Sequence, residues 1–178
     1  ATTEIYTLSL HDALRSQHHD RAGSHHVPLL ELSDGTYLSE SVAICRYIEA
    51  LHPSPNLMGE NPREMAEIEM WHRRMEFGLL LNIAFVIRHG VLAMQKLEHV
   101  QTPAWAEACK PRVEKAMREL DARLQQSPYV AGDRFTIADI TPWVAIDFMR
   151  VIKQGPPDDC EALNEWLARM RARPSAAA

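Results

Sequence analysis

Residues 27–44 read VPLLELSDGTYLSESVAI, and this stretch decides the fold. An apolar run, Val27 to Leu32, is followed by turn residues, of which Gly35 adopts a positive φ at little cost. A second short extended segment, Tyr37-Leu38, comes next, so the pattern predicts a β-hairpin. From Ser39 the apolar period changes from strand-like to helical, which predicts a helix directly after the hairpin.

The chain on either side of the hairpin differs in character. Upstream, residues 4–10 alternate in a way that predicts one further strand. Downstream, Pro53 ends the first helix, and every later segment has a helical pattern. The predicted helices span residues 62–95, 103–126, 136–153 and 161–173. We therefore predict an α/β unit in residues 1–53, a linker in 54–61 and an all-helical bundle in 62–178.

Composition excludes several classes of protein. The 178 residues are 46% hydrophobic and 24% charged, which is typical of a globular protein and not of a disordered one. A net charge of −5 gives no basic field for nucleic acid. The most apolar stretch, residues 79–86, is far shorter than the roughly 20 residues that cross a bilayer, so we expect no membrane segment. Three widely spaced cysteines without a CxxC pair favour a reducing, cytoplasmic location.

The start of the first predicted helix suits a small charged ligand. Free backbone N–H groups at a helix start, the hydroxyl of Ser41 and the helix dipole together favour a carboxylate. Glu40 beside them favours an ammonium group, so the pair suggests the α-amino-acid end of a ligand. The alternative interpretation is that Ser39 to Ser41 forms an N-cap and nothing more.

A proline at the start of a strand is a second local signal. Pro28 has no N–H to donate to a β-ladder, and bonds of this type are sometimes cis. A cis bond would reorient Val27 so that its main chain can pair with a ligand.

Two further sets of residues have structural interpretations. Thr136 and Asp139 have the spacing of a capping box at a helix start, where they fix the helix rather than take part in chemistry. Adjacent histidines, as at residues 18–19 and 25–26, point to opposite sides of an extended chain. We therefore expect no metal site.

The order of these signals resembles one known family. The segments VPLLEL, DG and LSESVAI, at residues 27–44, are similar to the second half of the thioredoxin-like domain of cytosolic glutathione S-transferases of the bacterial type. The segment YVAGDRFTIADI, residues 129–140, resembles the capping-box segment of their helical domain. The resemblance implies a thioredoxin-like N-terminal domain, incomplete here, followed by an all-helical C-terminal bundle.

The resemblance also implies roles for particular residues. Val27 would bind the cysteinyl backbone of glutathione through its main chain, with Pro28 in the cis form. Glu40 and Ser41 would hold the γ-glutamyl amine and carboxylate, and His26 would lie near the glycine end.

The sequence also departs from the family pattern. The Val-Pro dipeptide arrives about one βα unit too early, and the family's thiol-activating residue belongs to that first unit. We expect this unit to precede Ala1 in the whole protein; the alternative is a protein that lacks the catalytic element.

The function expected from the resemblance is conjugation of the glutathione thiolate to a small hydrophobic electrophile, as in detoxification. Glutathione is then a co-substrate, and no cofactor is expected. The alternatives are a non-catalytic binding or regulatory protein, and a glutathione-dependent isomerase, dehalogenase or peroxidase on the same fold. The resemblance also implies a homodimer. The sequence supports it, because one long predicted helix carries a mixture of Met, Trp and Arg that is typical of interfaces, at Met65, Ile68, Trp71, Arg74 and Met75.

Overall fold

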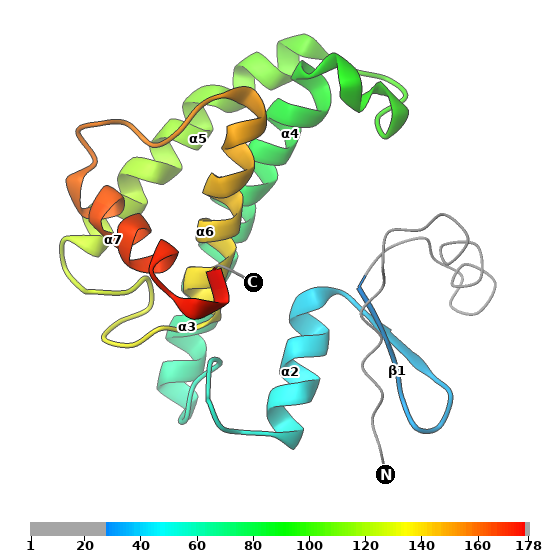
Figure 1. The fold of residues 1–178 in the computed structure, drawn as a ribbon, viewed down its shortest axis with the longest axis vertical. Helices are drawn as coiled ribbons and strands as arrows, with labels where there is room; N and C mark the ends of the chain where they lie inside the picture. Colours follow the sequence, from blue (N-terminus) through cyan, green and yellow to red (C-terminus); the bar gives the residue numbers. More distant parts are fainter. Residues whose placement is uncertain (1–27, 177–178) are drawn as a thin grey trace. The chain divides into compact units, whose positions relative to one another are not determined.

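The computed structural model describes residues 28–176, and the chain divides into two units, residues 1–56 and 57–178. This boundary falls inside the segment predicted as a linker. In the first unit the described residues form strands β1 (Leu29–Glu31) and β2 (Tyr37–Ser39), followed by helix α2 (Ser41–Leu51) (Figure 1). The strand predicted at residues 4–10 lies outside the described residues.

The two strands form the expected antiparallel hairpin. Its register pairs Leu29 with Ser39 and Leu30 with Leu38. In the turn, the Asp34 carboxylate accepts hydrogen bonds from the backbone N–H of Thr36 at 2.9 Å and from its hydroxyl at 2.6 Å. These bonds hold the pKa of Asp34 below its ordinary value. Gly35 has a φ of 81°, the left-handed conformation that glycine supplies at little cost.

Helix α2 contacts both strands and is anchored by a small apolar core. Leu30 on β1 and Ile44 on α2 are buried. Because apolar side chains gather on one side of the helix, its other side carries exposed residues, including Cys45. The helix ends at Leu51, and His52 is its C-cap, directly before Pro53, where the sequence predicts the end.

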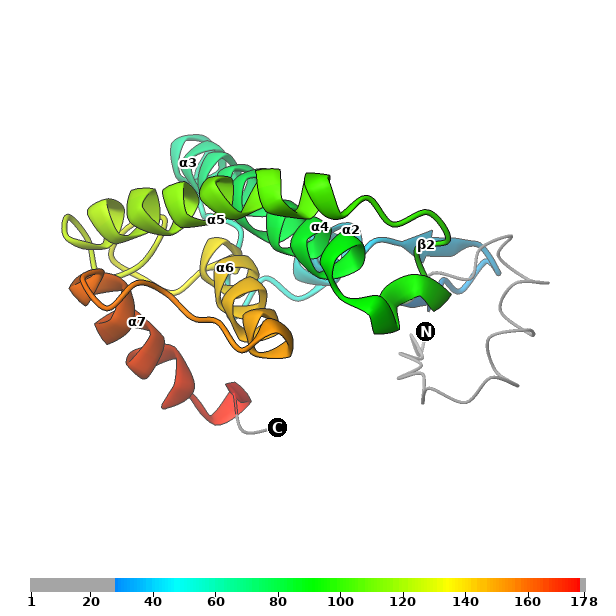
Figure 2. The same cartoon turned by 90° about the horizontal axis from the view of Figure 1, so that it is seen from above.

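The second unit is entirely helical within its described residues (Figure 2). Each of the four helices predicted for this unit, from residues 62, 103, 136 and 161, begins within one residue of the expected position. The unit contains α3 (Pro62–Met75), the π-helical segment η1 (Glu76–Leu80), α4 (Leu81–Gly90), η2 (Leu92–Lys96), α5 (Pro103–Leu124), α6 (Ile137–Phe148), η3 (Met149–Ile152), α7 (Glu161–Arg171) and η4 (Pro174–Ala176).

The prediction of one long helix over residues 62–95 is wrong at its C-terminal end, and the observed helical run is interrupted in its middle by a π-helical segment. Its α-helical part stops at Gly90, where Val91 is extended and the Gln101 side chain donates to the carbonyls of Arg88 and Val91. Within the run, the Asn82 amide donates to the carbonyls of Phe77 and Gly78, at 3.0 and 2.9 Å, in the π-helical segment. A side chain that donates hydrogen bonds to the backbone carbonyls of this segment stabilises its wider, π-helical turn.

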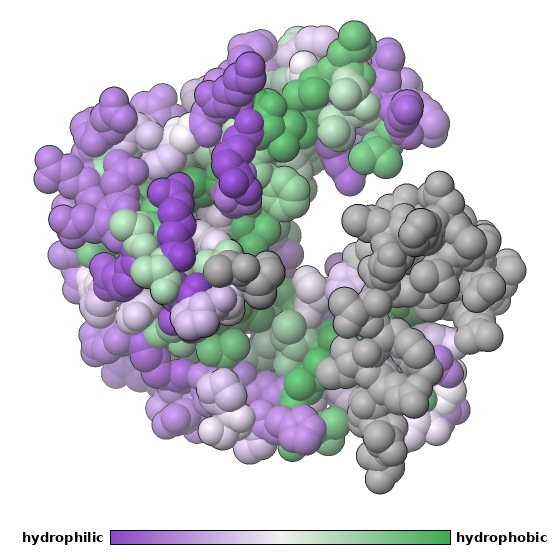
Figure 3. All heavy atoms as spheres, in the orientation of Figure 1, coloured by the Kyte–Doolittle hydropathy of each residue, from purple (hydrophilic) through white to green (hydrophobic). Residues whose placement is uncertain are grey.

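The core of the helical unit lies between α4, α5, α6 and α7. Leu79, Leu120, Leu163 and Trp166 have no exposed surface. The flank formed by α5 and α7 is hydrophilic, whereas hydrophobic side chains gather on the flank of α4 and α6 (Figure 3). No helix in residues 28–176 is both long enough and apolar enough to cross a membrane.

Candidate functional site

The structure brings three of the predicted site residues to one end of the hairpin. Pro28 directly precedes β1, and Glu40 directly follows β2. Because Leu29 pairs with Ser39, these two residues flank the same end of the ladder. Ser41 begins α2 at this point, and all three residues are exposed.

The backbone of Glu40 turns the chain from the strand into the helix. Its φ of 69° is in the left-handed region, which a non-glycine residue occupies at a cost of about 1–3 kcal/mol. Its carbonyl accepts the first helical hydrogen bond, from the N–H of Ile44 at 3.0 Å. A costly conformation at an exposed position is common where a binding site fixes the backbone.

The first turn of α2 is suited to an anion. The Glu40 side chain makes no capping hydrogen bond, and the first turn holds no acidic residue. The positive end of the helix dipole, where the backbone N–H groups of this turn point, is therefore not offset by these side chains. A carboxylate group fits there, beside the Ser41 hydroxyl, while the Glu40 carboxylate is free to meet an ammonium group.

Two of the predicted ligand residues lie outside the described residues. These are His26 and Val27. The peptide bond between Val27 and Pro28, expected to be cis, lies outside the described residues for the same reason. Cys45 on α2 is a poor candidate for a nucleophile. The residue is exposed, but its thiol is partly desolvated, and this desolvation together with the nearby Glu49 carboxylate raises the pKa of the thiol. Within residues 28–176, no three His, Cys, Asp or Glu side chains gather as a metal site would require.

The capping box at the start of α6 is present. The Thr136 backbone N–H donates to Oδ2 of Asp139 at 2.9 Å. Oδ1 of the same carboxylate accepts from the backbone N–H of Val130 at 2.9 Å and from the indole N–H of Trp166 at 3.1 Å. Asp139 is completely buried, so these bonds serve the fold and not a ligand.

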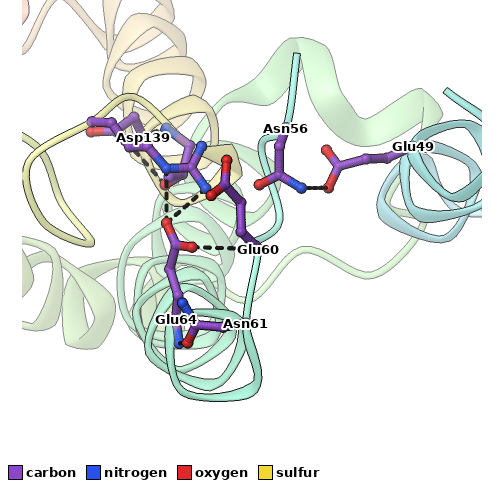
Figure 4. A network of polar contacts seen from close by, with 8 residues as sticks. Glu49, Asn56, Glu60, Asn61, Glu64 and Asp139 are labelled. Atoms are coloured by element: carbon purple, nitrogen blue, oxygen red, sulfur yellow. Dashed lines mark hydrogen bonds and ion pairs between the residues drawn. The ribbon is translucent and has the colours of Figure 1, made fainter. Parts of the chain in front are cut away.

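Sequence reasoning missed two other polar anchors of the helical unit. The Arg134 guanidinium pairs with Glu64 at 2.7 Å, and Glu64 also accepts the backbone N–H of Glu60 at 2.8 Å (Figure 4). The buried Asp121 carboxylate accepts the N–H of Leu163 at 2.9 Å, which ties α5 to α7. The two residues of each contact are 70 and 42 positions apart in the sequence, so no local pattern predicts either contact.

Comparison with known proteins gives the same assignment for both parts of the chain. The family model "Glutathione S-transferase, N-terminal domain" matches residues 3–51, and "Glutathione S-transferase, C-terminal domain" matches residues 103–169. Among curated proteins, glutathione S-transferase 2 of Saccharomyces cerevisiae is 38% identical over 150 residues, which are 84% of this chain and 64% of that protein. The chain spans between 58% and 64% of the length of this and two further curated relatives.

Two solved structures are similar throughout most of their length. The crystal structure of Gtt2 from Saccharomyces cerevisiae has a TM-score of 0.83 and 36% identity, covering 90% of this chain and 78% of that one. A glutathione S-transferase domain-containing protein of Marinobacter aquaeolei VT8 has a TM-score of 0.84 and 33% identity, covering 90% and 79%. The fold class expected from the sequence, a thioredoxin-like domain followed by a helical bundle, is thereby confirmed. On this identity and coverage, the chain belongs to the glutathione S-transferase family.

Proposed function

We propose that the protein is a glutathione transferase that binds the γ-glutamyl end of glutathione at Glu40 and Ser41. The observation that carries this proposal is their position at the strained start of α2, in a chain of this family. The γ-glutamyl end carries one ammonium and one carboxylate on the same carbon. Adjacent residues that favour opposite charges match that arrangement, and the hairpin end beside Pro28 provides the backbone next to it.

The reaction proposed is attack of the glutathione thiolate on a small hydrophobic electrophile. A thiolate is the nucleophile in such a step, and a free thiol has a pKa near about 8.5, so the main chemical task is to stabilise the thiolate near neutral pH. The electrophile would bind to apolar side chains of the helical unit. Its exposed apolar residues near the ends of α4 and α6 include Leu92, Leu97, Val100, Phe148 and Val151.

Calorimetric titration with glutathione tests the binding site. Ser41→Ala removes a hydroxyl from the carboxylate end, and Glu40→Gln removes the charge that meets the ammonium. Each change is expected to weaken binding by about 1 kcal/mol or more, which is at least fivefold. Ser33→Ala, in the exposed hairpin turn, is the matched control and keeps full affinity. Wild-type affinity in both site variants would remove the basis of the site.

Turnover separates the transferase from its alternatives. A transferase consumes glutathione and an aryl halide together and forms a thioether. Saturable glutathione binding without turnover of aryl halides, peroxides or isomerisable substrates would favour a binding or regulatory protein. Product formation with only one of the other substrates would favour an isomerase, a dehalogenase or a peroxidase on the same fold.

We also propose that the protein is a homodimer in the cytoplasm, assembled between the α/β unit of one subunit and the long helices of the other. In support, Met65, Met70 and Phe77 expose apolar surface along α3 and η1. Trp71 and Arg74 border a groove of about 800 Å³ between these elements and α5. Ile68 and Met75, which the sequence also suggested for an interface, are buried within the helical unit and belong to its core. The three free thiols suit a reducing compartment.

A further inference from the structure

A cavity of about 490 Å³ lies in the helical unit between α4, α5 and the segment that follows α6. Its floor consists of apolar side chains that are almost completely buried: Ile83, Val86, Val113, Met117 and Met149. Gln154, Gly155 and Pro157, in the segment after η3, line its more exposed edge, which we call the mouth. All lining residues belong to one unit, and none belongs to the elements that carry Glu40 and Ser41. A volume in this range and an apolar floor are typical of sites for small molecules.

The wall that α5 contributes to the cavity has an unusual backbone. Pro111 lines the cavity in the middle of this helix. Because proline has no N–H, the carbonyl of Glu107, one turn earlier, lacks its α-helical donor. That oxygen remains a hydrogen-bond acceptor one turn before the part of α5 where Pro111 lines the cavity.

The charges at the rim favour a cation. Lys110 is neutralised by Glu107, with 2.6 Å between Nζ and the carboxylate. Arg118, by contrast, is shared by two carboxylates, Glu114 at 3.0 Å and Asp159 at 2.8 Å. Together the five side chains carry one more negative charge than positive charges. Lys110 and Glu114 are the two members that line the cavity, and the charge of Lys110 is already met by Glu107, which leaves the Glu114 carboxylate as the partner for a cation.

We propose that this cavity binds small amphiphilic amines. The apolar body of the ligand lies on the floor formed by Val113, Met117 and Met149. The ammonium group pairs with the Glu114 carboxylate, which shares its guanidinium partner, Arg118, with Asp159. No step of this proposal involves glutathione, so it stands or fails separately from the proposed function.

Three ligands of one shape and different charge test the chemistry. Phenylbutylamine is a cation, phenylbutanol is neutral and phenylbutanoate is an anion. With methyl-labelled methionine, nuclear magnetic resonance titration of the whole chain should show saturable shifts at Met117 and Met149. The exposed Met65 and Met70 on α3 serve as internal controls and should not move. The amine should bind about threefold to fivefold more tightly than the alcohol, as one exposed ion pair provides, and the anion should bind most weakly.

Two variants test the location. Glu114→Gln should reduce the preference for the amine over the alcohol to less than about twofold, because it removes the charged partner. Glu119→Gln, on the same helix and paired with Lys115, is the matched control and should keep the preference. Gly155→Phe places an aromatic ring at the mouth, where an added Cβ meets no atom within 4 Å, and should weaken all three ligands without changing the unfolding midpoint.

Several results would overturn the proposal. These are the absence of saturable shifts at Met117 and Met149 up to the solubility limit of the amine, equal binding of the anion and the amine, and full binding in a folded Gly155→Phe variant. An amine preference that survives Glu114→Gln would overturn the assigned cation partner.

Discussion

The indole N–H of Trp166 in α7 donates a hydrogen bond to Oδ1 of Asp139 at the start of α6, across 3.1 Å. Both side chains are completely buried. Because the same carboxylate also accepts the backbone N–H groups of Val130 and Thr136, one residue joins α6, the loop before it and α7. Burial raises the pKa of Asp139, and the hydrogen bonds oppose that shift. The first helical turn of α6 is therefore tied to an element that follows it by more than twenty residues.

Asp139→Ala is expected to lower the free energy of unfolding by about 3–5 kcal/mol, because four donor groups of the buried residues Val130, Thr136 and Trp166 lose their acceptor. Glutathione affinity of the protein that stays folded should not change. Denaturant unfolding measures the first effect and calorimetry the second. Asp133→Ala, exposed in the same loop, is the control and should change stability by no more than about 0.5 kcal/mol. An unchanged unfolding midpoint in Asp139→Ala would contradict the role given to this carboxylate.

The Glu64 carboxylate gives the helical unit a pH-dependent contact. The backbone N–H of Glu60 and the Arg134 guanidinium lower its pKa below the ordinary value of 4.5. A carboxyl whose pKa is lower in the folded protein contributes stability above its unfolded pKa, and this contribution is lost as the pH falls through the folded pKa.

We therefore expect Glu64→Gln to be less stable than wild type at pH 7, by about 0.5–1 kcal/mol, because the pair is only partly exposed. The difference should shrink as the pH falls below about 4.5. Unfolding midpoints measured across this range check it. Glu67→Gln removes a more exposed partner of Arg63 on the same helix and should show a much smaller difference. A Glu64→Gln deficit that is constant with pH would exclude the ion pair as its cause.

Local signals in the sequence were enough to predict the hairpin and the helix starts. A turn residue with positive φ at Gly35, and prolines at the first turn of α3 and α5, act within a few residues of themselves. The helix ends were harder. The end of α4 at Gly90 depends on Gln101, which lies more than ten residues away and reaches back to the open carbonyls.

The candidate site was predictable in part for the same reason. Glu40 and Ser41 are adjacent, so their chemistry is visible in the sequence, but the left-handed φ of Glu40 is not. Glutamate has no intrinsic preference for that conformation, which comes from the way the hairpin joins α2. The cavity beside Pro111 could not be predicted from the sequence either, because its walls come from α4, α5 and the segment after α6, which are far apart along the chain.

The strain at Glu40 leads to a prediction in which stability and binding change in opposite directions. Glu40→Gly relieves the left-handed φ of 69° and is expected to raise the free energy of unfolding by about 1 kcal/mol. It also removes the carboxylate, so glutathione affinity should fall at least as far as in Glu40→Gln. Lys153→Gly, at a φ of 54° after η3, is the control: it should stabilise the protein similarly and leave binding unchanged. A loss of stability in Glu40→Gly would show that the conformation carries no strain.

The groove between α3 and α5 gives a direct test of the proposed homodimer. Two guanidinium groups lie against the ring of Trp71, with that of Arg74 at 4.8 Å and that of Arg123 at 5.1 Å from its centroid. Arg74 is exposed, and the neighbouring Phe77 leaves 58% of its surface open. Arginine stacked on tryptophan, next to open apolar surface, is typical of the residues that contribute most at interfaces.

Arg74→Glu is expected to weaken association of the protein at least about tenfold, because a twofold interface contains the changed residue twice. It also exchanges an attraction between guanidinium and ring for a carboxylate beside the same ring. Sedimentation equilibrium at micromolar concentration measures the effect. Arg63→Glu reverses a charge on the same helix, at a side chain that is 87% exposed, and should leave the association constant unchanged. A wild-type protein that sediments as a single species of monomer mass would rule out the dimer. Equal weakening by both variants would mean that net charge, and not the groove at Trp71, controls association.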